Sequence, residues 1–84
     1  MPYAISAPRR VQGQLRQIPQ QQRQAIIADI EALAETPRPH GCIKLTNRPG
    51  WRIRVGDYRV IYEIDDTART IAVLDIQHRS QAYR

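Results

Sequence analysis

Hydrophobic and polar residues alternate through WRIRVGDYRVIYEID, the stretch that runs from Trp51 to Asp65. The alternation continues on both sides of Gly56 and Asp57, a pattern that is typical of two antiparallel strands joined by a two-residue turn. In that register Val55 pairs with Tyr58. The stretch therefore predicts a β-hairpin, with Gly56 in a turn conformation that needs a positive φ angle.

The same register places three arginines on one face of the predicted hairpin. Arg54 lies opposite Arg59, and Arg52 follows two residues along the same face. The other face carries the apolar set Trp51, Ile53, Val55, Tyr58, Val60 and Tyr62. Like charges that face each other across strands destabilise a sheet by roughly 0.2–1 kcal/mol, so the arginine face favours an anionic partner, most obviously nucleic acid.

The first half of the chain has helical periodicity after a short alternating stretch, Pro2 to Ser6, that predicts an N-terminal strand. Apolar residues recur at helical spacing in two segments, as Val11, Leu15 and Ile18 and then as Ile26, Ile30 and Leu33. Pro19 separates the two predicted helices, and the second runs from Gln20 to about Glu35. Two prolines and a glycine in residues 36–41 prevent its continuation.

Strand-like alternation returns after Gly41, with further strands predicted at Ile43–Leu45 and at Thr70–Gln77. These elements indicate an α+β fold, in which an N-terminal strand and two helices pack on one face of a small antiparallel sheet. At 84 residues the chain is near the lower size limit for one hydrophobic core, so we expect a single domain spanning residues 1–84. The helices should cover the apolar face of the hairpin and leave the arginine face open.

Charge strengthens the expectation of an anionic partner. The formal net charge is +5 at pH 7, and Lys44 is the single lysine among 13 basic residues. Arginine presents a planar group that suits bidentate contact with phosphate. Lys44 and Arg48 are predicted to extend the basic surface by contacting backbone phosphates.

Cys42 is the only cysteine, so the chain can form neither an internal disulfide nor a cysteine-based zinc site. The first residues lack the apolar run of a secretory signal, and no stretch approaches the roughly 20 apolar residues of a membrane span. We therefore expect a cytoplasmic protein with no membrane partner.

Three segments together resemble the RelE-type toxins of the RelE/ParE superfamily. They are KLTNRPGW, WRIRVGDYRVIYEIDD and IAVLDIQHRSQAYR. The most specific features are the arginines of the predicted hairpin and the ending in which His78-Arg79 is followed by Tyr83. The resemblance covers nearly the whole chain and implies a RelE-like fold.

The resemblance also implies an activity, that of the toxin component of a type II toxin–antitoxin system. Such a toxin enters the ribosomal A site and cleaves messenger RNA, with no metal and no cofactor, through attack of the 2′-hydroxyl on the adjacent phosphate. Carried over by motif, the catalytic positions are Arg52, Arg54, Arg59, Arg79 and Tyr83. The guanidinium groups would stabilise the charge of the transition state, and the tyrosine would stack on a base. The implied partners are the ribosome, messenger RNA and a cognate antitoxin.

The chain departs from the family pattern at the first strand of the hairpin. At positions 52 and 54 the family pattern has lysines that can serve as proton acceptors, whereas this chain has arginines. Arginine does not lose its proton in proteins. His78 is the nearby side chain whose ordinary pKa suits proton transfer. Strict alternation would place His78 and Arg79 on opposite faces, so both can serve only if the strand bends or ends there.

Three alternatives stay open at this point. The same fold serves toxins of the ParE type, which inhibit DNA gyrase without cutting RNA, and fold alone does not assign function. The missing lysines fit an inactive member that only binds its antitoxin. The arginine face can also be a solvated surface whose charges pair with Glu63 or Asp75. Whether the chain is a nuclease, a gyrase inhibitor or an inactive member, we expect an acidic antitoxin segment to lie over the basic face.

Overall fold

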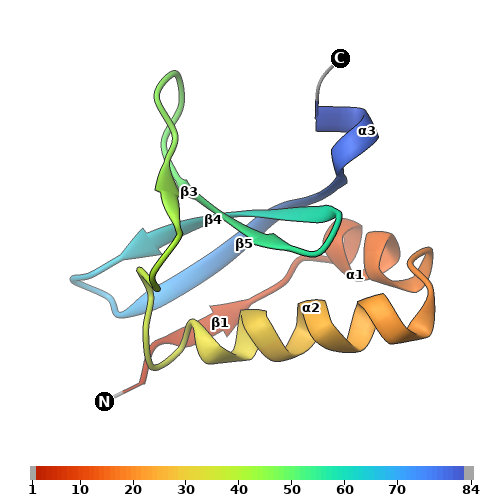
Figure 1. The fold of residues 1–84 in the computed structure, drawn as a ribbon. Helices are drawn as coiled ribbons and strands as arrows, with labels where there is room; N and C mark the ends of the chain where they lie inside the picture. Colours follow the sequence, from red (N-terminus) through yellow and green to blue (C-terminus); the bar gives the residue numbers. More distant parts are fainter. Residues whose placement is uncertain (1, 83–84) are drawn as a thin grey trace.

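The computed structural model describes residues 2–82 and arranges them as five strands and three helices (Figure 1). In chain order the elements are β1 (Ala4–Ser6), α1 (Arg9–Arg16), α2 (Gln20–Ala32), β2 (Ile43–Lys44), β3 (Trp51–Val55), β4 (Tyr58–Asp65), β5 (Thr70–His78) and α3 (Arg79–Ala82). The predicted α+β class is confirmed. Among the described residues, no helix is long and apolar enough to cross a bilayer.

The five strands form one sheet in the order β1-β5-β4-β3-β2. Strands β2 to β5 pair with one another in antiparallel fashion, as predicted. The prediction of an antiparallel sheet is wrong for β1, which runs parallel to β5 and pairs Ile5 with Ile71. Parallel neighbours need a long crossover connection, and here the whole of the intervening chain supplies it.

Helices α1 and α2 cover one face of the sheet, whereas α3 and the loop between β2 and β3 rise from the other (Figure 1). The buried core therefore lies between these two helices and the sheet. Its members are Val11, Ile18, Ile26, Ile30, Leu33, Ile53, Val60, Tyr62, Ile71, Val73 and Ile76. The expected helical stripes and the expected apolar face of the hairpin both contribute to it.

Helix α2 ends at Ala32, three residues before the predicted end at about Glu35. The next turns are tightened by bonds between residues three apart, such as Ala34 N–H to the Glu31 carbonyl at 3.1 Å. The Ala34 carbonyl then accepts the N–H of Tyr3 at 2.8 Å. The Ala34 carbonyl therefore bonds to the backbone before β1, instead of to a later N–H group of a longer α2.

The predicted register of the hairpin is confirmed. Val55 pairs with Tyr58 and Arg54 with Arg59, with Gly56 in the turn at a φ of 59°. Gly56 therefore has the left-handed conformation expected of it.

Pairing between β4 and β5 contains a β-bulge that the sequence did not reveal. Ile61 pairs with Asp75, but Tyr62 pairs with Val73, so Leu74 is the extra residue on β5. Val73 before the bulge and Ile76 after it are both buried in the core. The bulge consequently turns Asp75 toward the arginine face, and Gln77, two residues further, follows it.

An ion pair ties three distant segments together at the end of the sheet where the chain begins. The Asp66 carboxylate, in the β4–β5 turn, accepts a hydrogen bond from the Tyr3 hydroxyl at 2.7 Å and from Arg38 at 2.8 Å. The Arg38 guanidinium also lies 5.0 Å from the centre of the Trp51 ring. The contacts with Arg38, and then with Tyr3, lower the pKa of Asp66 from 3.8 to about 2.

We expect this carboxylate to make folding sensitive to acid. Because the folded-state pKa is lowered, the stabilisation is present above pH 3.8 and is lost as the pH falls through about 2. Asp66→Asn should therefore lower the free energy of unfolding at neutral pH and remove part of its decrease in acid. Urea unfolding of both proteins, at neutral pH and near pH 2, measures these differences in the free energy of unfolding.

The matched control is Glu31→Gln, which removes an exposed carboxylate from α2. It should leave the acid dependence close to that of the parent. Parallel pH profiles for the parent and Asp66→Asn would contradict the assignment.

Candidate functional site

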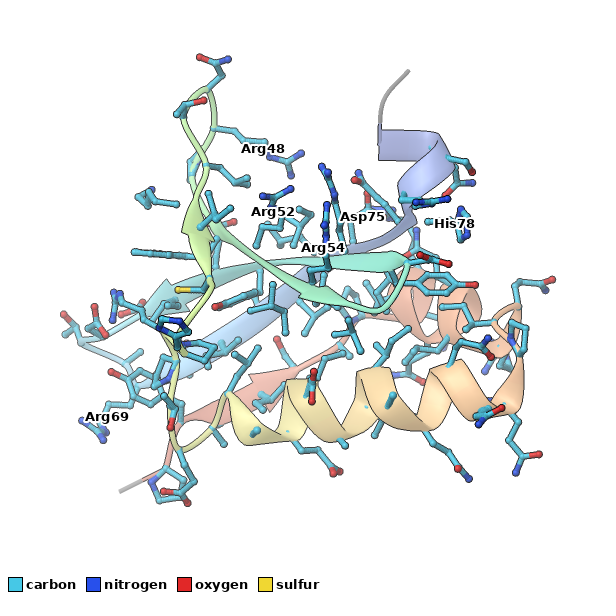
Figure 2. The ribbon with its side chains drawn as sticks, in the orientation of Figure 1. Arg48, Arg52, Arg54, Arg69, Asp75 and His78 are labelled. Carbon is cyan, nitrogen blue, oxygen red and sulfur yellow. The ribbon has the colours of Figure 1, made fainter. Side chains whose placement is uncertain are left out.

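Basic side chains gather on the face of the sheet opposite α1 and α2. Figure 2 shows Arg48, Arg52 and Arg54 extending on that side, with Asp75 on the same side over β5. Arg59 joins them from β4, because its backbone lies directly opposite Arg54. The hairpin thus presents its arginines as predicted from the alternation.

A hollow of about 300 Å³, here called the basic hollow, opens on this face. Its lining consists of Ile43, Lys44, Leu45, Thr46, Arg48, Arg52, Arg59, Ile61 and Gln77. Three apolar side chains and three arginine side chains therefore share one concave surface. Such a surface can hold a flat ring against its apolar part and an anionic group against its cations.

The predicted site residues are only partly brought together. Lys44, Arg48, Arg52 and Arg59 all line the basic hollow. Lys44 also lies over Trp51, with its ammonium nitrogen 5.7 Å from the ring centre. Arg48, Arg52 and Arg59 thus form a continuous basic surface, whereas Lys44 pairs with Trp51 in the sheet and directs its ammonium group to the Trp51 side.

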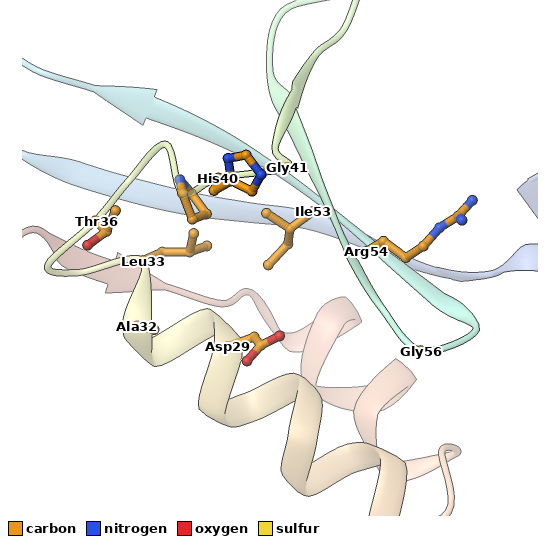
Figure 3. A pocket seen from close by; sticks show the side chains of 10 residues that line it. Asp29, Ala32, Leu33, Thr36, His40, Gly41, Ile53, Arg54 and Gly56 are labelled. Carbon is orange, nitrogen blue, oxygen red and sulfur yellow. The ribbon is translucent and has the colours of Figure 1, made fainter.

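Arg54 lies at the boundary of a second and larger hollow, between β3 and the end of α2. Its volume is about 650 Å³, and Figure 3 shows Asp29, Leu33 and Ile53 lining it while Arg54 extends away from α2. His40, the loop histidine, also lines it. The lining is largely apolar and includes a carboxylate, so this hollow is less suited to an anion than the basic hollow is.

Of the two polar residues of β5 on the arginine face, the sequence analysis named Asp75 as a possible partner of the arginines and missed Gln77. Gln77 lies opposite Arg59 in the sheet, and its amide nitrogen donates to the Asp75 carboxylate at 2.8 Å. The same carboxylate accepts hydrogen bonds from Gln14 at 2.7 Å and from Arg10 at 3.2 Å. The period-two spacing of Asp75 and Gln77 indicated that they share a face, but the bulge at Leu74 decides which face that is.

The charge of Asp75 is maintained by these contacts. Partial burial opposes its ionisation, but the hydrogen bonds from Gln14 and Gln77 and the charge of Arg10 outweigh that effect. The pKa of Asp75 consequently lies below its ordinary value. The carboxylate is therefore an acceptor at neutral pH, with its partners on α1 and β5.

His78 and Arg79 lie away from the basic hollow, at the end of β5. The His78 ring packs edge-on against Tyr58, with ring centres 5.1 Å apart, so it belongs to the face that packs on the core. Its Nδ1 is 2.9 Å from the hydroxyl of Ser80. Strand β5 ends at His78, and such an end was the condition for His78 and Arg79 both to serve in one site.

Arg79 begins α3 and is bound to the hairpin turn. Its N–H donates to the Asp57 carbonyl at 2.7 Å, and its Nε is 3.8 Å from the Asp57 carboxylate. Both side chains are mostly exposed, so the ion pair is readily broken. Tyr83, the remaining predicted site residue, lies outside the described residues.

The side chains that could bind a metal ion are scattered over the described part of the chain. In residues 2–82, no three His, Cys, Asp or Glu side chains are grouped so that they could hold an ion.

Solved structures of toxins resemble this fold over most of its length. The RelE of the archaeal RelE–RelB complex from Pyrococcus horikoshii OT3 superposes with a TM-score of 0.84 at 26% identity, over 96% of this chain and 99% of that one. The toxin–antitoxin complex RelBE2 of Mycobacterium tuberculosis gives 0.82 at 24% identity, covering 94% and 100%. The isolated RelE toxin of E. coli gives 0.77 at 22% identity, covering 96% and 90%.

Comparison with curated protein sequences gave no match. A family model does match, that of the ParE toxin of the type II toxin–antitoxin system parDE, and it covers residues 5–83. That range includes all three described helices, the arginine hairpin and β5. The chain therefore belongs to the RelE/ParE family of toxins of type II toxin–antitoxin systems.

Proposed function

We propose that this toxin is an endoribonuclease that cleaves messenger RNA on the ribosome. The observation that carries the proposal is the basic hollow, where Arg48, Arg52 and Arg59 surround a space of about 300 Å³. Its apolar part can contact a base while the arginines contact phosphate. The solved RelE structures support the fold on which this activity is expected.

The reaction needs charge stabilisation more than it needs a metal. The 2′-hydroxyl oxygen forms a bond to the adjacent phosphorus, the bond from phosphorus to the 5′-oxygen breaks, and that oxygen leaves as a hydroxyl. Negative charge builds on the phosphate oxygens between these events. Arg52 and Arg59, fixed by neighbouring strands, can stabilise that charge by charge-assisted hydrogen bonds.

Proton transfer is the step for which the basic hollow is least equipped. Arginine does not act as a base, and His78 packs against Tyr58 on the other face of the sheet. In our proposal the arginines therefore act by charge stabilisation, while groups of the ribosome around the bound RNA accept the proton of the 2′-hydroxyl and supply the proton that the leaving 5′-oxygen gains. His78 can take part only if α3 moves with the end of β5.

Arg54, Arg79 and Tyr83 have proposed roles at the border of the site. Arg54 extends the cationic surface along β3 and contacts the RNA backbone. Arg79 is held at Asp57 by an exposed ion pair, which RNA phosphate can replace because little free energy is lost with it. Tyr83 would stack on a base next to the scissile bond.

We also propose that a cognate antitoxin covers the basic face. The Pyrococcus horikoshii relative was solved as a complex with RelB, and so was the RelE of Methanococcus jannaschii. A net charge of +5 favours a partner segment rich in Asp and Glu. Such a segment would neutralise Arg48, Arg52 and Arg59 and exclude RNA from the basic hollow.

A second candidate function is inhibition of DNA gyrase, the activity expected of ParE-type toxins. The match to the ParE toxin model over residues 5–83 favours it. In that case the arginine face would bind a protein surface instead of RNA.

Induction of this chain in cells, followed by mapping of messenger-RNA 5′ ends with and without translation, separates the two functions. We expect cuts at in-frame codon positions that require active ribosomes. Arg59→Ala should lower the cutting rate about 10²–10³-fold, because one fixed donor to the developing charge is lost. Arg16→Ala, on the helical side, is the control and should cut like the parent.

Intact transcripts in arrested cells, together with induction of the DNA-damage response, would instead establish the gyrase-directed activity. Cuts that persist unchanged in Arg59→Ala would remove the basic hollow from the mechanism.

The phosphate contacts can be tested separately by the salt dependence of binding to a single-stranded RNA oligonucleotide. Each arginine that neutralises one phosphate contributes about 0.7 to the slope of log K against log salt concentration. Arg52→Gln and Arg59→Gln should each lower the slope by about that amount. Arg16→Gln should leave it unchanged, and equal slopes for all four proteins would place the RNA elsewhere.

A further inference from the structure

The basic hollow contains one group that phosphate binding does not require, the amide of Gln77. The arginines and Lys44 can only donate hydrogen bonds, and phosphate contacts carry no information about base sequence. Gln77 presents both a donor and an acceptor on the floor of the sheet, directly opposite Arg59. An amide in such a position is suited to reading the edge of a base.

The orientation of this amide is set by Asp75. An ionised carboxylate only accepts hydrogen bonds, so the group of Gln77 that faces it at 2.8 Å must be the amide nitrogen. Asp75 is itself held from α1 by Gln14 and Arg10. The carbonyl oxygen of Gln77 therefore points away from Asp75, with the second N–H of the amide beside it.

Apolar side chains complete a surface that suits a ring. Ile43 is 48% exposed on a face that is otherwise rich in charge, and Ile61 below it is 5% exposed. Leu45 lines the same hollow. A volume of about 300 Å³ is at the small end of ligand pockets and fits one nucleotide better than several.

We propose that the basic hollow is an adenine-binding subsite, in which the Gln77 amide pairs with the donor–acceptor edge of the base and the arginines bind its phosphate. This inference rests on the proposed action on RNA and adds the base that the site selects. The Gln77 carbonyl accepts from the adenine amino group, and its free N–H donates to the adjacent ring nitrogen.

The carboxylate of Asp75 accounts for the selection against other bases. On adenine the ring nitrogen N1, which accepts from the amide, is flanked by the C2–H group. On cytosine the corresponding acceptor N3 is flanked by the acceptor O2. On guanine the corresponding acceptor O6 is flanked by the acceptor N7, and in both bases this second acceptor would approach the charge of Asp75. Uracil escapes this repulsion but offers a smaller ring to Ile43 and Leu45. Asp75 is thus a positioning residue that also excludes competitors.

The test is binding of the four nucleoside 5′-monophosphates to the purified full chain, followed by NMR shifts of the Gln77 side-chain amide. AMP should bind about tenfold more tightly than GMP or CMP, the discrimination expected of one good bidentate pair. Gln77→Ala should bind all four with similar affinity, since phosphate contacts remain. Gln24→Ala on α2 is the matched control and should keep the preference.

Asp75→Asn distinguishes positioning from a purely structural role. It removes the charge that repels a second acceptor, so GMP and CMP should gain affinity relative to AMP, a change that loss of stability does not produce. Denaturant unfolding of each variant verifies that it is folded. Equal affinity of the parent for all four nucleotides, or an unchanged AMP preference in Gln77→Ala, would overturn the subsite.

This outcome is separable from that of the proposed function. Preferential AMP binding by a chain that leaves transcripts intact would support the subsite and refute the nuclease. Ribosome-dependent cutting by a parent without nucleotide preference would support the nuclease and refute the subsite.

Discussion

The bulge at Leu74 controls which side chains of the last strand reach the basic face. Without it, the alternation that buries Val73 would turn Ile76 out of the core and Asp75 into it. A carboxylate turned into the apolar core would carry a large desolvation cost. One extra residue therefore lets the strand keep an apolar face before and after it, while Asp75 and Gln77 join the arginines.

The two faces of the sheet have opposite physical requirements. Helices α1 and α2 bury the apolar face, and this packing holds the strands in register. The arginine face then carries like charges at fixed positions, with Arg54 opposite Arg59. The cost is roughly 0.2–1 kcal/mol for such a pair, small beside the gain from burying the core, so the fold can tolerate a surface that an anion would stabilise.

The hairpin was predictable in detail because its register depends on local alternation and on a turn of known geometry. Helix boundaries were less so, since Ala34 is drawn into a hydrogen bond with Tyr3, far away in the sequence. The placement of Arg52 and Arg59 on one face was predictable because it depends only on the local register of the hairpin. Gln77 was missed because a bulge is a property of two paired strands and has no signature in one of them.

The amino-acid sequence by itself determined the α+β class, the hairpin register and the collection of arginines on one face, because each follows from periodicity and turn chemistry within a short stretch. Only the tertiary structure decided that β1 runs parallel to β5, that His78 packs on the core side and that Asp75 orients Gln77. These features depend on contacts between residues far apart in the chain. Their energies are set by which surfaces meet, and local pattern does not contain that information.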